Sequence, residues 1–297
     1  DMWQGWKRLR KEWGLPDVVQ MNVLDKNGLL ALYLKRRYHI PYFIIEHWSG
    51  YLPANFAFRG GWHGWIMRHI AKHANGIMPV SNVLKNAMQT CGIENAHWQK
   101  INNVVDDFFY QPYVKEPRTK KRLLHVSCFD DKAKNVKGLL QATRKVAEKR
   151  QDFELVLVGT GVDFEAVKTY ADSLQFPDEM LLFTGEKTPT QVCQWMQQSD
   201  AFVLFSRYET AGVVLAECLA VGLPIIGANA GAIPEVVNAQ TGMLVPSEDE
   251  NALANAISFM LDHYQEYNTA LIREQGKQYS FATIGQQLIS LYENHIS

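Results

Sequence analysis

Two glutamates, Glu209 and Glu217, stand eight residues apart where an apolar stretch gives way to a helical one. Glu209 follows the run AFVLF at 201–205, which has the character of a buried strand, and Gly212 stands at the start of the segment that carries Glu217. The free N–H groups and positive dipole at such a helix start favour a phosphate. The carboxylates would repel that phosphate, but each can accept hydrogen bonds from two neighbouring hydroxyls. The pattern therefore predicts a nucleotide-sugar, a diphosphate with hydroxyl groups on both sides.

The same pair has a simpler explanation, which is one favourable charge near a helix start and one solvated face. Glu217, however, interrupts an otherwise apolar run over 213–220. A glutamate in such a run is rarely buried without a cation or a hydrogen-bond donor beside its carboxylate. This context favours the binding interpretation.

Short apolar runs alternate with helical segments along the whole chain, which is typical of parallel sheets covered by helices. The runs expected as strands are 16–22, 42–46, 76–80, 98–105, 122–128, 154–159, 181–185, 201–205, 224–228 and 242–245. The segments expected as helices are 27–38, 62–74, 82–91, 136–149, 162–174, 190–197, 212–221, 250–262, 267–278 and 282–295. Ligands bind beyond the carboxyl ends of the strands in such sheets, where the loop of Glu209 would lie.

A polar stretch at 111–121 with two prolines has the character of a linker. The chain has 297 residues and 47% hydrophobic composition, enough for two cores. We therefore expect two doubly wound, Rossmann-like α/β domains that face a cleft. Their predicted bounds are 1–112 and 113–280, with a last helix over 281–297 that packs back toward the first domain. The opening DMWQGW has the character of the middle of a domain, so the first domain is expected to be incomplete.

Charge is distributed unevenly along the chain. The first 112 residues carry 13 Lys and Arg against 8 Asp and Glu, and the remainder carries 17 against 23. A basic first half suggests an anionic partner such as a membrane surface or an anionic acceptor. Nucleic acid is not expected, because the excess is modest and no nucleic-acid motif is present.

Four cysteines without a C-x-x-C pair indicate a reducing compartment. No apolar run approaches the roughly 20 residues that cross a bilayer. We therefore expect a cytoplasmic location, either free in the cytoplasm or at the inner face of the membrane. Trp3, Trp6 and Trp13 alternate with basic residues and form either a membrane-surface or lipid-acceptor patch or ordinary core packing. His69 and His73 have helical spacing but no evident third ligand, so no metal site is expected.

The segment 202–237 resembles the signature of the retaining glycosyltransferases of family 4, which have the GT-B fold. The residues that match the family pattern are Ser206, Glu209, Gly212, Glu217, Gly222, Pro224, Gly231 and Glu235. Four further family segments recur in order, namely EHWSG at 46–50, PVSNVLKNAM at 79–88, NVVDDFFYQP at 103–112 and KNVKGLLQA at 134–142.

The resemblance implies transfer of a hexose or N-acetylhexosamine from a nucleotide-sugar to a glycan or lipid-linked acceptor. It also implies a place in cell-surface polysaccharide synthesis, with the nucleotide-sugar as co-substrate and with neither cofactor nor metal. A nucleotide-sugar epimerase of similar fold, or a donor-binding fragment without transfer activity, are the alternatives.

The resemblance also implies roles for individual residues. His47 and Glu209 would act at the sugar, and Glu217 would bind both ribose hydroxyls. Lys134 would contact the diphosphate, with Lys132 as a second cation because Cys128 stands near the place of a family arginine. The backbone that would cradle the diphosphate belongs to Thr210, Ala211, Gly212 and Val213. The residues expected near the nucleobase are Gly185, Glu186 and Lys187.

Overall fold

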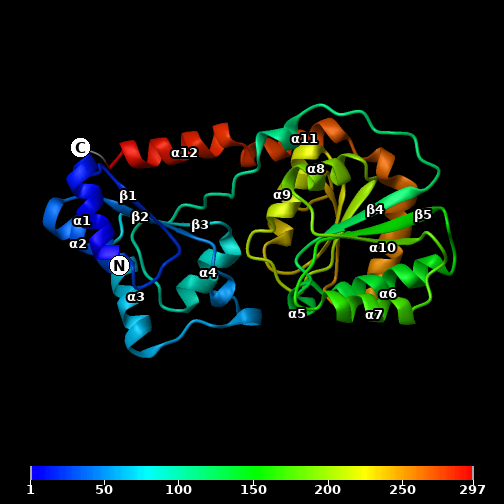
Figure 1. Cartoon of the computed structure of the whole chain (residues 1–297), viewed down its shortest axis with the longest axis horizontal. Helices are drawn as coiled ribbons and strands as arrows, with labels where there is room; N and C mark the ends of the chain where they lie inside the picture. Colours follow the sequence, from blue (N-terminus) through cyan, green and yellow to red (C-terminus); the bar gives the residue numbers. More distant parts are fainter. Residues whose placement is uncertain (1, 296–297) are drawn as a thin grey trace. The chain divides into compact units, whose positions relative to one another are not determined.

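The computed structural model describes residues 2–295, and the chain separates into two compact units (Figure 1). Unit 1 comprises the chain up to Asn103 together with the segment from Ala282. Unit 2 comprises Val104–Phe281. The sequence placed the division after residue 112, but Phe109 is already part of the core of unit 2. The polar linker signal begins only after this packed segment, and it therefore marked the boundary too late.

Unit 1 contains a parallel sheet of three strands in the order β1-β2-β3. The strands are β1 (Val19–Asn22), β2 (Tyr42–Glu46) and β3 (Gly76–Pro79). Its helices are α1 (Met2–Trp13), α2 (Gly28–Tyr38), α3 (Gly61–His73), α4 (Asn82–Thr90) and most of α12 (Phe281–Glu293). Strand β2 is buried at every residue because a strand pairs with each of its edges.

Helix α12 lies against the sheet of unit 1, where the Tyr292 ring is 5.2 Å from that of Phe43. The strand expected over 98–105 does not form. Backbone hydrogen bonds join Ile77 and Pro79 of β3 to the segment 97–101, but among the described residues the strand pairing of 98–105 is limited to isolated bridges, from Trp98 to Ile77 in unit 1 and from Val105 to Ser280 in unit 2. The polar residues between 99 and 103 interrupt the apolar pattern that a strand needs.

Unit 2 contains a parallel sheet of six strands in the order β6-β5-β4-β7-β8-β9. The strands are β4 (Lys121–Val126), β5 (Phe153–Val158), β6 (Leu181–Gly185), β7 (Ala201–Leu204), β8 (Ile225–Ala228) and β9 (Gly242–Val245). The chain runs outward from β4 to β6 and then returns to build β7, β8 and β9 on the other side. The β4–β7 junction is thus a topological switch point, the place where open α/β sheets bind ligands.

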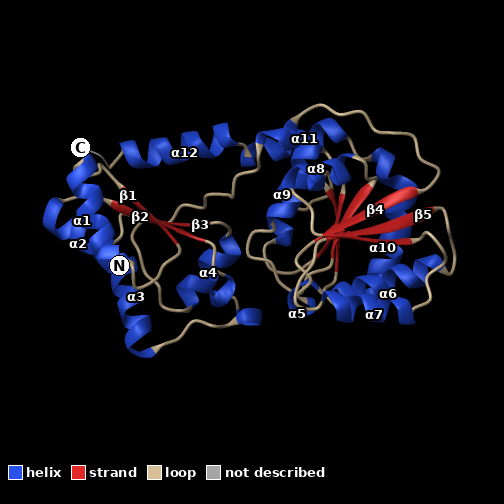
Figure 2. Cartoon of the chain, viewed as in Figure 1, coloured by secondary structure: helices blue, strands red, loops and turns tan. Residues whose placement is uncertain are grey.

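Helices cover both faces of this second sheet (Figure 2). One side carries α6 (Val136–Ala147), α7 (Phe164–Ser173) and α10 (Glu250–His263). The other carries α8 (Pro189–Gln197), α9 (Val213–Val221) and α11 (Thr269–Gly276). A short helix α5 (Asp131–Lys134), which the sequence did not reveal, precedes α6. In the part of the chain that the structure describes, no helix has both the length and the apolar character to span a membrane.

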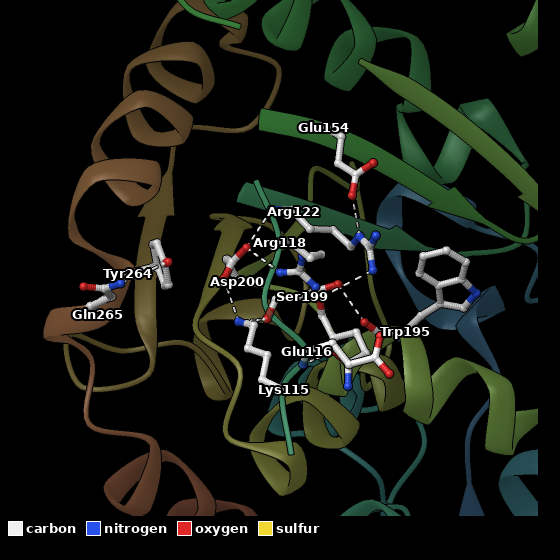
Figure 3. Close-up of polar contacts among 11 residues, drawn as sticks. Lys115, Glu116, Arg118, Arg122, Glu154, Trp195, Ser199, Asp200, Tyr264 and Gln265 are labelled. Atoms are coloured by element: carbon white, nitrogen blue, oxygen red, sulfur yellow. Dashed lines mark hydrogen bonds and ion pairs between the residues drawn. The ribbon is translucent and has the colours of Figure 1, made fainter. Parts of the chain in front are cut away.

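The stretch expected as a linker belongs to unit 2, where two of its basic side chains bind Asp200 (Figure 3). Lys115 Nζ lies 2.6 Å from Asp200 Oδ1, and Arg118 Nη2 lies 2.8 Å from Asp200 Oδ2. Lys115 Nζ also donates to the Ser199 carbonyl at 2.6 Å. Asp200 is buried, and these two cations compensate its charge. These contacts hold the segment against the amino-terminal end of β7.

Candidate functional site

The loops that follow β4 and β7 are joined at the switch point of unit 2. The two strands are neighbours in the sheet, and the backbone N–H of Arg207 donates to the Ala133 carbonyl at 2.8 Å. This hydrogen bond brings the turn of α5 beside the loop that carries Glu209. Residues more than 70 positions apart in the sequence therefore share one site.

Lys134 and Glu209 form a direct ion pair in this site, with Lys134 Nζ 2.6 Å from Glu209 Oε1. The Ser206 hydroxyl donates to the same oxygen at 2.9 Å. The pair is largely enclosed, since the Lys134 side chain is 18% exposed and that of Glu209 10%. No donor among the described residues reaches Glu209 Oε2. The residues expected separately at the diphosphate and at the sugar are thus linked to each other.

Arg207, which the sequence reasoning missed, holds the α5 turn in place. Its Nη1 donates to the Asp131 carbonyl at 2.5 Å and its Nη2 to Asn135 Oδ1 at 2.7 Å. Asn135 is buried in the left-handed conformation, with φ 50°, between Lys134 and the start of α6. The available signal was an arginine in the loop after the predicted strand 201–205. Its partners, Asp131 and Asn135, lie in the α5 turn, far away in the sequence.

The start of α9 presents a row of free backbone amides. Gly212 precedes the helix with φ 63°, a conformation that glycine adopts without a steric penalty. Among the described residues, no carbonyl accepts from the N–H groups of Ala211, Gly212, Val213 or Val214, and the first amide to be bonded is that of Leu215, to the Gly212 carbonyl. Thr210, by contrast, interacts elsewhere within the protein. Four free N–H groups at a helix start can bind an anion.

Glu217 lies farther along α9 with its carboxylate unpaired. No donor within the described part of the chain hydrogen-bonds to it, although a glutamate that is partly buried on an apolar helix would ordinarily have a partner. Burial, together with the nearby negative charge of Asp106, raises the pKa of Glu217 to about 7. A free acceptor in a low-dielectric position suits a hydroxyl-bearing ligand.

The loop after β8 supports the backbone of Glu209. The N–H of Ala232 donates to the Glu209 carbonyl at 2.9 Å. Gly231, at φ 52°, packs so closely that an added Cβ would lie 2.4 Å from the same carbonyl oxygen. The glycine at this position therefore permits the approach of the two loops.

The remaining residues expected at the donor site are spread along the carboxyl ends of the strands of unit 2. Lys132 is exposed on α5, and Cys128 is exposed in the loop after β4. Gly185 ends the edge strand β6, followed by the exposed Glu186. The Lys187 ammonium donates to the Thr184 carbonyl at 2.6 Å, which fixes this turn.

His47 directly follows β2 and belongs to unit 1. Partial desolvation of its ring lowers the pKa of His47, and a side-chain hydrogen bond with Asn103 opposes that shift. The loop is shaped by Glu46, whose buried carboxylate accepts the N–H groups of Leu24, His47 and Trp48 at 2.8–2.9 Å. These three hydrogen bonds make Glu46 a structural residue of the His47 loop.

Two further groups from the sequence have different outcomes. Helix α1 contains no buried residue, and Trp13 is 79% exposed, whereas the Trp3 and Trp6 rings lie 5.2 and 6.4 Å from those of Tyr33 and Tyr38 of α2. The rings of His69 and His73 lie 4.4 Å apart, and Arg36 Nη2 is 3.1 Å from His69 Nε2. Within residues 2–295, no group of three or more His, Cys, Asp or Glu side chains is placed to hold a metal ion.

Two family models together match residues 1–278 of the chain. The model of the family described as glycosyl transferases group 1 matches residues 108–278, and that of Glycosyltransferase Family 4 matches residues 1–107. N-acetyl-alpha-D-glucosaminyl L-malate synthase of Bacillus anthracis is 28% identical over 77% of this chain, and phosphatidyl-myo-inositol mannosyltransferase of Mycobacterium leprae is 29% identical over 60% of it. The alignments span 61% and 47% of the lengths of these two relatives.

A solved structure, sucrose-phosphate synthase from Thermosynechococcus elongatus, superposes on 98% of this chain and 76% of its own, with a TM-score of 0.83 at 20% identity. This likeness confirms the predicted fold class of two Rossmann-like α/β domains.

Proposed function

The chain belongs to the glycosyl transferases group 1 family, and on that premise we propose that it is a retaining glycosyltransferase. It transfers a hexose or N-acetylhexosamine from a nucleotide-sugar to a glycan or lipid-linked acceptor, in the synthesis of cell-surface polysaccharide. The names of two relatives support this proposal. One name describes an N-acetylglucosaminyl product, which supports the sugar, and the other describes a phosphatidyl-myo-inositol mannosyltransferase, which supports both the hexose and a lipid-linked acceptor.

The observation that carries the proposal is the row of free amides before α9, flanked by Lys134 and by the unpaired carboxylate of Glu217. In our assignment the diphosphate binds the amides of Ala211–Val213, and Glu217 accepts both ribose hydroxyls. Lys134 exchanges its ion pair for the phosphate and stabilises the charge of the departing diphosphate.

Glu209, once freed from Lys134, accepts hydrogen bonds from the sugar. His47, from unit 1, acts at the transferred sugar. Lys132 supplies further positive charge, Thr210 completes the diphosphate loop, and the base lies near Gly185–Lys187. The reaction in this assignment uses no metal, because the helix start and Lys134 supply the positive charge.

A thermal-shift panel of UDP-, GDP- and ADP-sugars tests donor binding, because a ligand at about 100 times its Kd stabilises the folded state by about 2.7 kcal/mol. A transfer assay with the stabilising donor then tests catalysis, with and without EDTA. No shift with any donor would refute the donor site. A shift without transfer would support the donor-binding alternative, an isomerised donor without acceptor would support the epimerase, and loss of transfer in EDTA would refute the role of the helix start.

We also propose a cytoplasmic location against the membrane surface, carried by α1. Its exposed Trp13 and its basic residues combine an aromatic anchor with positive charge. Sedimentation with vesicles should show binding that requires anionic lipid and that weakens in Trp13→Ala. Equal binding to neutral vesicles would contradict the electrostatic part of this assignment.

A further inference from the structure

Unit 1 contains a cavity of about 560 Å³ that no step of the proposed reaction uses. Its walls come from the turns after β2, the start of α3 and the end of α4. The volume is typical of pockets that enclose a small ligand. Tyr51, on its wall, follows His47 by four residues in the chain, and the Tyr51 ring lies 5.1 Å from that of Trp48. One wall of the cavity thus belongs to the segment that follows the His47 loop in the chain.

Three aromatic rings line the cavity. Tyr51 and Phe58 are both buried, with ring centroids 5.3 Å apart, and Phe56 is 62% exposed at the rim. Such a wall favours an apolar ligand, because rings gain by removing hydrocarbon from water. A free sugar would need several polar partners here, and the lining offers few.

A basic side chain on the wall indicates what else the ligand carries. Arg68 Nε and Nη2 both donate to the Cys91 carbonyl, at 3.0 and 2.9 Å, and the guanidinium lies over the Phe58 ring, 5.4 Å from its centroid. Its Nη1 has no hydrogen-bond partner among the described residues. None of the lining side chains is acidic. A cation beside an apolar wall suits an amphiphile with an anionic group.

We propose that this cavity binds a hydrocarbon chain of a phospholipid acceptor, with the lipid phosphate at Arg68. The inference rests on the proposed function and deepens it, because it selects a lipid acceptor over a free glycan. The cavity holds the lipid, and the neighbouring His47 loop receives its headgroup.

Titration of the whole chain with monomeric dioctanoyl phosphatidate, followed by calorimetry, tests the cavity. Glycerol 3-phosphate carries the phosphate without chains, and dioctanoylglycerol carries the chains without phosphate. We expect each to bind about tenfold more weakly than phosphatidate or worse, since tenfold is about 1.4 kcal/mol and a hydrogen bond to a charged group contributes about that much or more. Equal affinity of glycerol 3-phosphate would overturn the lipid assignment.

A matched pair of variants locates the site. Thr90 lines the cavity and is exposed, whereas the exposed Gln89 beside it does not line it. Thr90→Trp should fill the mouth and weaken phosphatidate binding about tenfold or more, and Gln89→Trp should leave it unchanged. Arg68→Gln should weaken phosphatidate but not dioctanoylglycerol. Equal effects of the two tryptophans would place the lipid on the surface and overturn the inference.

Donor thermal shifts on the same samples separate this inference from the proposed function, because the donor residues belong to unit 2. Absent lipid binding with an intact donor shift would refute the cavity assignment alone. Lipid binding without any donor shift would refute the donor site and leave the cavity assignment standing. Should Arg68→Gln lose its cooperative thermal unfolding, the exposed Thr90 and Gln89 variants still decide the question.

Discussion

At the scale of single residues, the proposed donor site contains two carboxylates in opposite situations, a buried one in Glu209 and a partly buried one in Glu217. Glu209 is neutralised by Lys134 and oriented by Ser206. Glu217 has neither a cation nor a donor beside it among the described residues, and burial raises its pKa. An unpaired charge that is partly buried lowers the stability of the fold. The presence of Glu217 on an apolar helix is therefore better explained by binding of a ligand than by stability.

The first prediction concerns Glu217→Gln, which removes the titrating group and keeps its shape. The pKa of Glu217 is about 7 in the folded protein, against an ordinary value of 4.5. Stability therefore falls as pH rises through that window, because the unfolded chain loses this proton first. The variant should have a higher Tm than the native protein at about pH 8, an advantage that disappears below about pH 4.5.

The same variant should bind the donor about tenfold more weakly, because a neutral amide replaces a charged acceptor of the ribose hydroxyls. Calorimetry at about pH 8, where the native carboxylate is ionised, measures this difference. An unchanged donor affinity, or a lower Tm at that pH, would contradict the assignment of Glu217.

The second prediction concerns the ion pair of Lys134 and Glu209. Lys134→Met should cost about 3 kcal/mol of unfolding free energy, because a buried carboxylate loses its cation. The double variant Lys134→Met/Glu209→Gln should recover much of that loss without recovering transfer activity. Urea unfolding of the two single variants and the double variant gives the coupling energy.

The exposed pair Lys72 and Glu94, 3.9 Å apart, is the control for this cycle. Lys72→Met should change stability by no more than about 1 kcal/mol, because solvent screens an exposed pair. Strictly additive losses at Lys134 and Glu209 would mean that the contact has no energetic role.

At the scale of elements, the site depends on loops held together across neighbouring strands. The turn of α5 carries Lys134, and Arg207 from the loop after β7 binds the Asp131 carbonyl and the Asn135 side chain around it. The planar guanidinium reaches these two acceptors through two separate nitrogens, Nη1 and Nη2, a fixed spacing that a single ammonium nitrogen lacks. Arg207 is therefore a positioning residue for Lys134.

The third prediction follows from this geometry. Arg207→Met and Arg207→Lys should both raise the donor KM more than they lower kcat, because the turn that presents Lys134 to the diphosphate loosens. Glu248→Gln is the matched control, since it removes only the exposed partner of the same guanidinium, 2.7 Å from Nε. Steady-state kinetics with the preferred donor measures the split, and an Arg207→Lys variant with native KM would argue against positioning by the guanidinium.

At the scale of the whole molecule, the proposed donor groups and His47 belong to different compact units. Lys134, Glu209 and Glu217 all lie in unit 2, whose core is one continuous cluster drawn from residues 105–279. A domain with its own core and its own ligand groups can fold and bind independently.

The fourth prediction is that the fragment 104–281 folds cooperatively and binds the donor nucleotide with the Kd of the whole chain. It should transfer no sugar, because His47 is absent from it. Thermal unfolding, calorimetry and the transfer assay test these three points in turn. The Glu217→Gln form of the fragment is the control for specific binding, and a fragment that folds without donor affinity would place essential donor contacts in unit 1.

Most elements of the fold could be predicted because their signals are local. Strands 42–46 and 181–185 have the predicted bounds, since each is an apolar run flanked by turn residues. The strand expected over 98–105 was wrong, because a few apolar residues around a polar centre do not form a ladder. Helix α5 was missed because four residues are too short to show a helical period.

The sequence by itself determined the alternation of elements and the family, and it predicted a short list of donor groups, because motif residues keep their spacing whatever their neighbours do. Only the tertiary structure decided that Lys134 pairs with Glu209, that Arg207 holds the α5 turn, and that Glu217 has no partner within residues 2–295. These contacts depend on which strands become neighbours in the sheet. That choice is made by the packing of the whole unit, which brings together residues that the linear pattern keeps far apart.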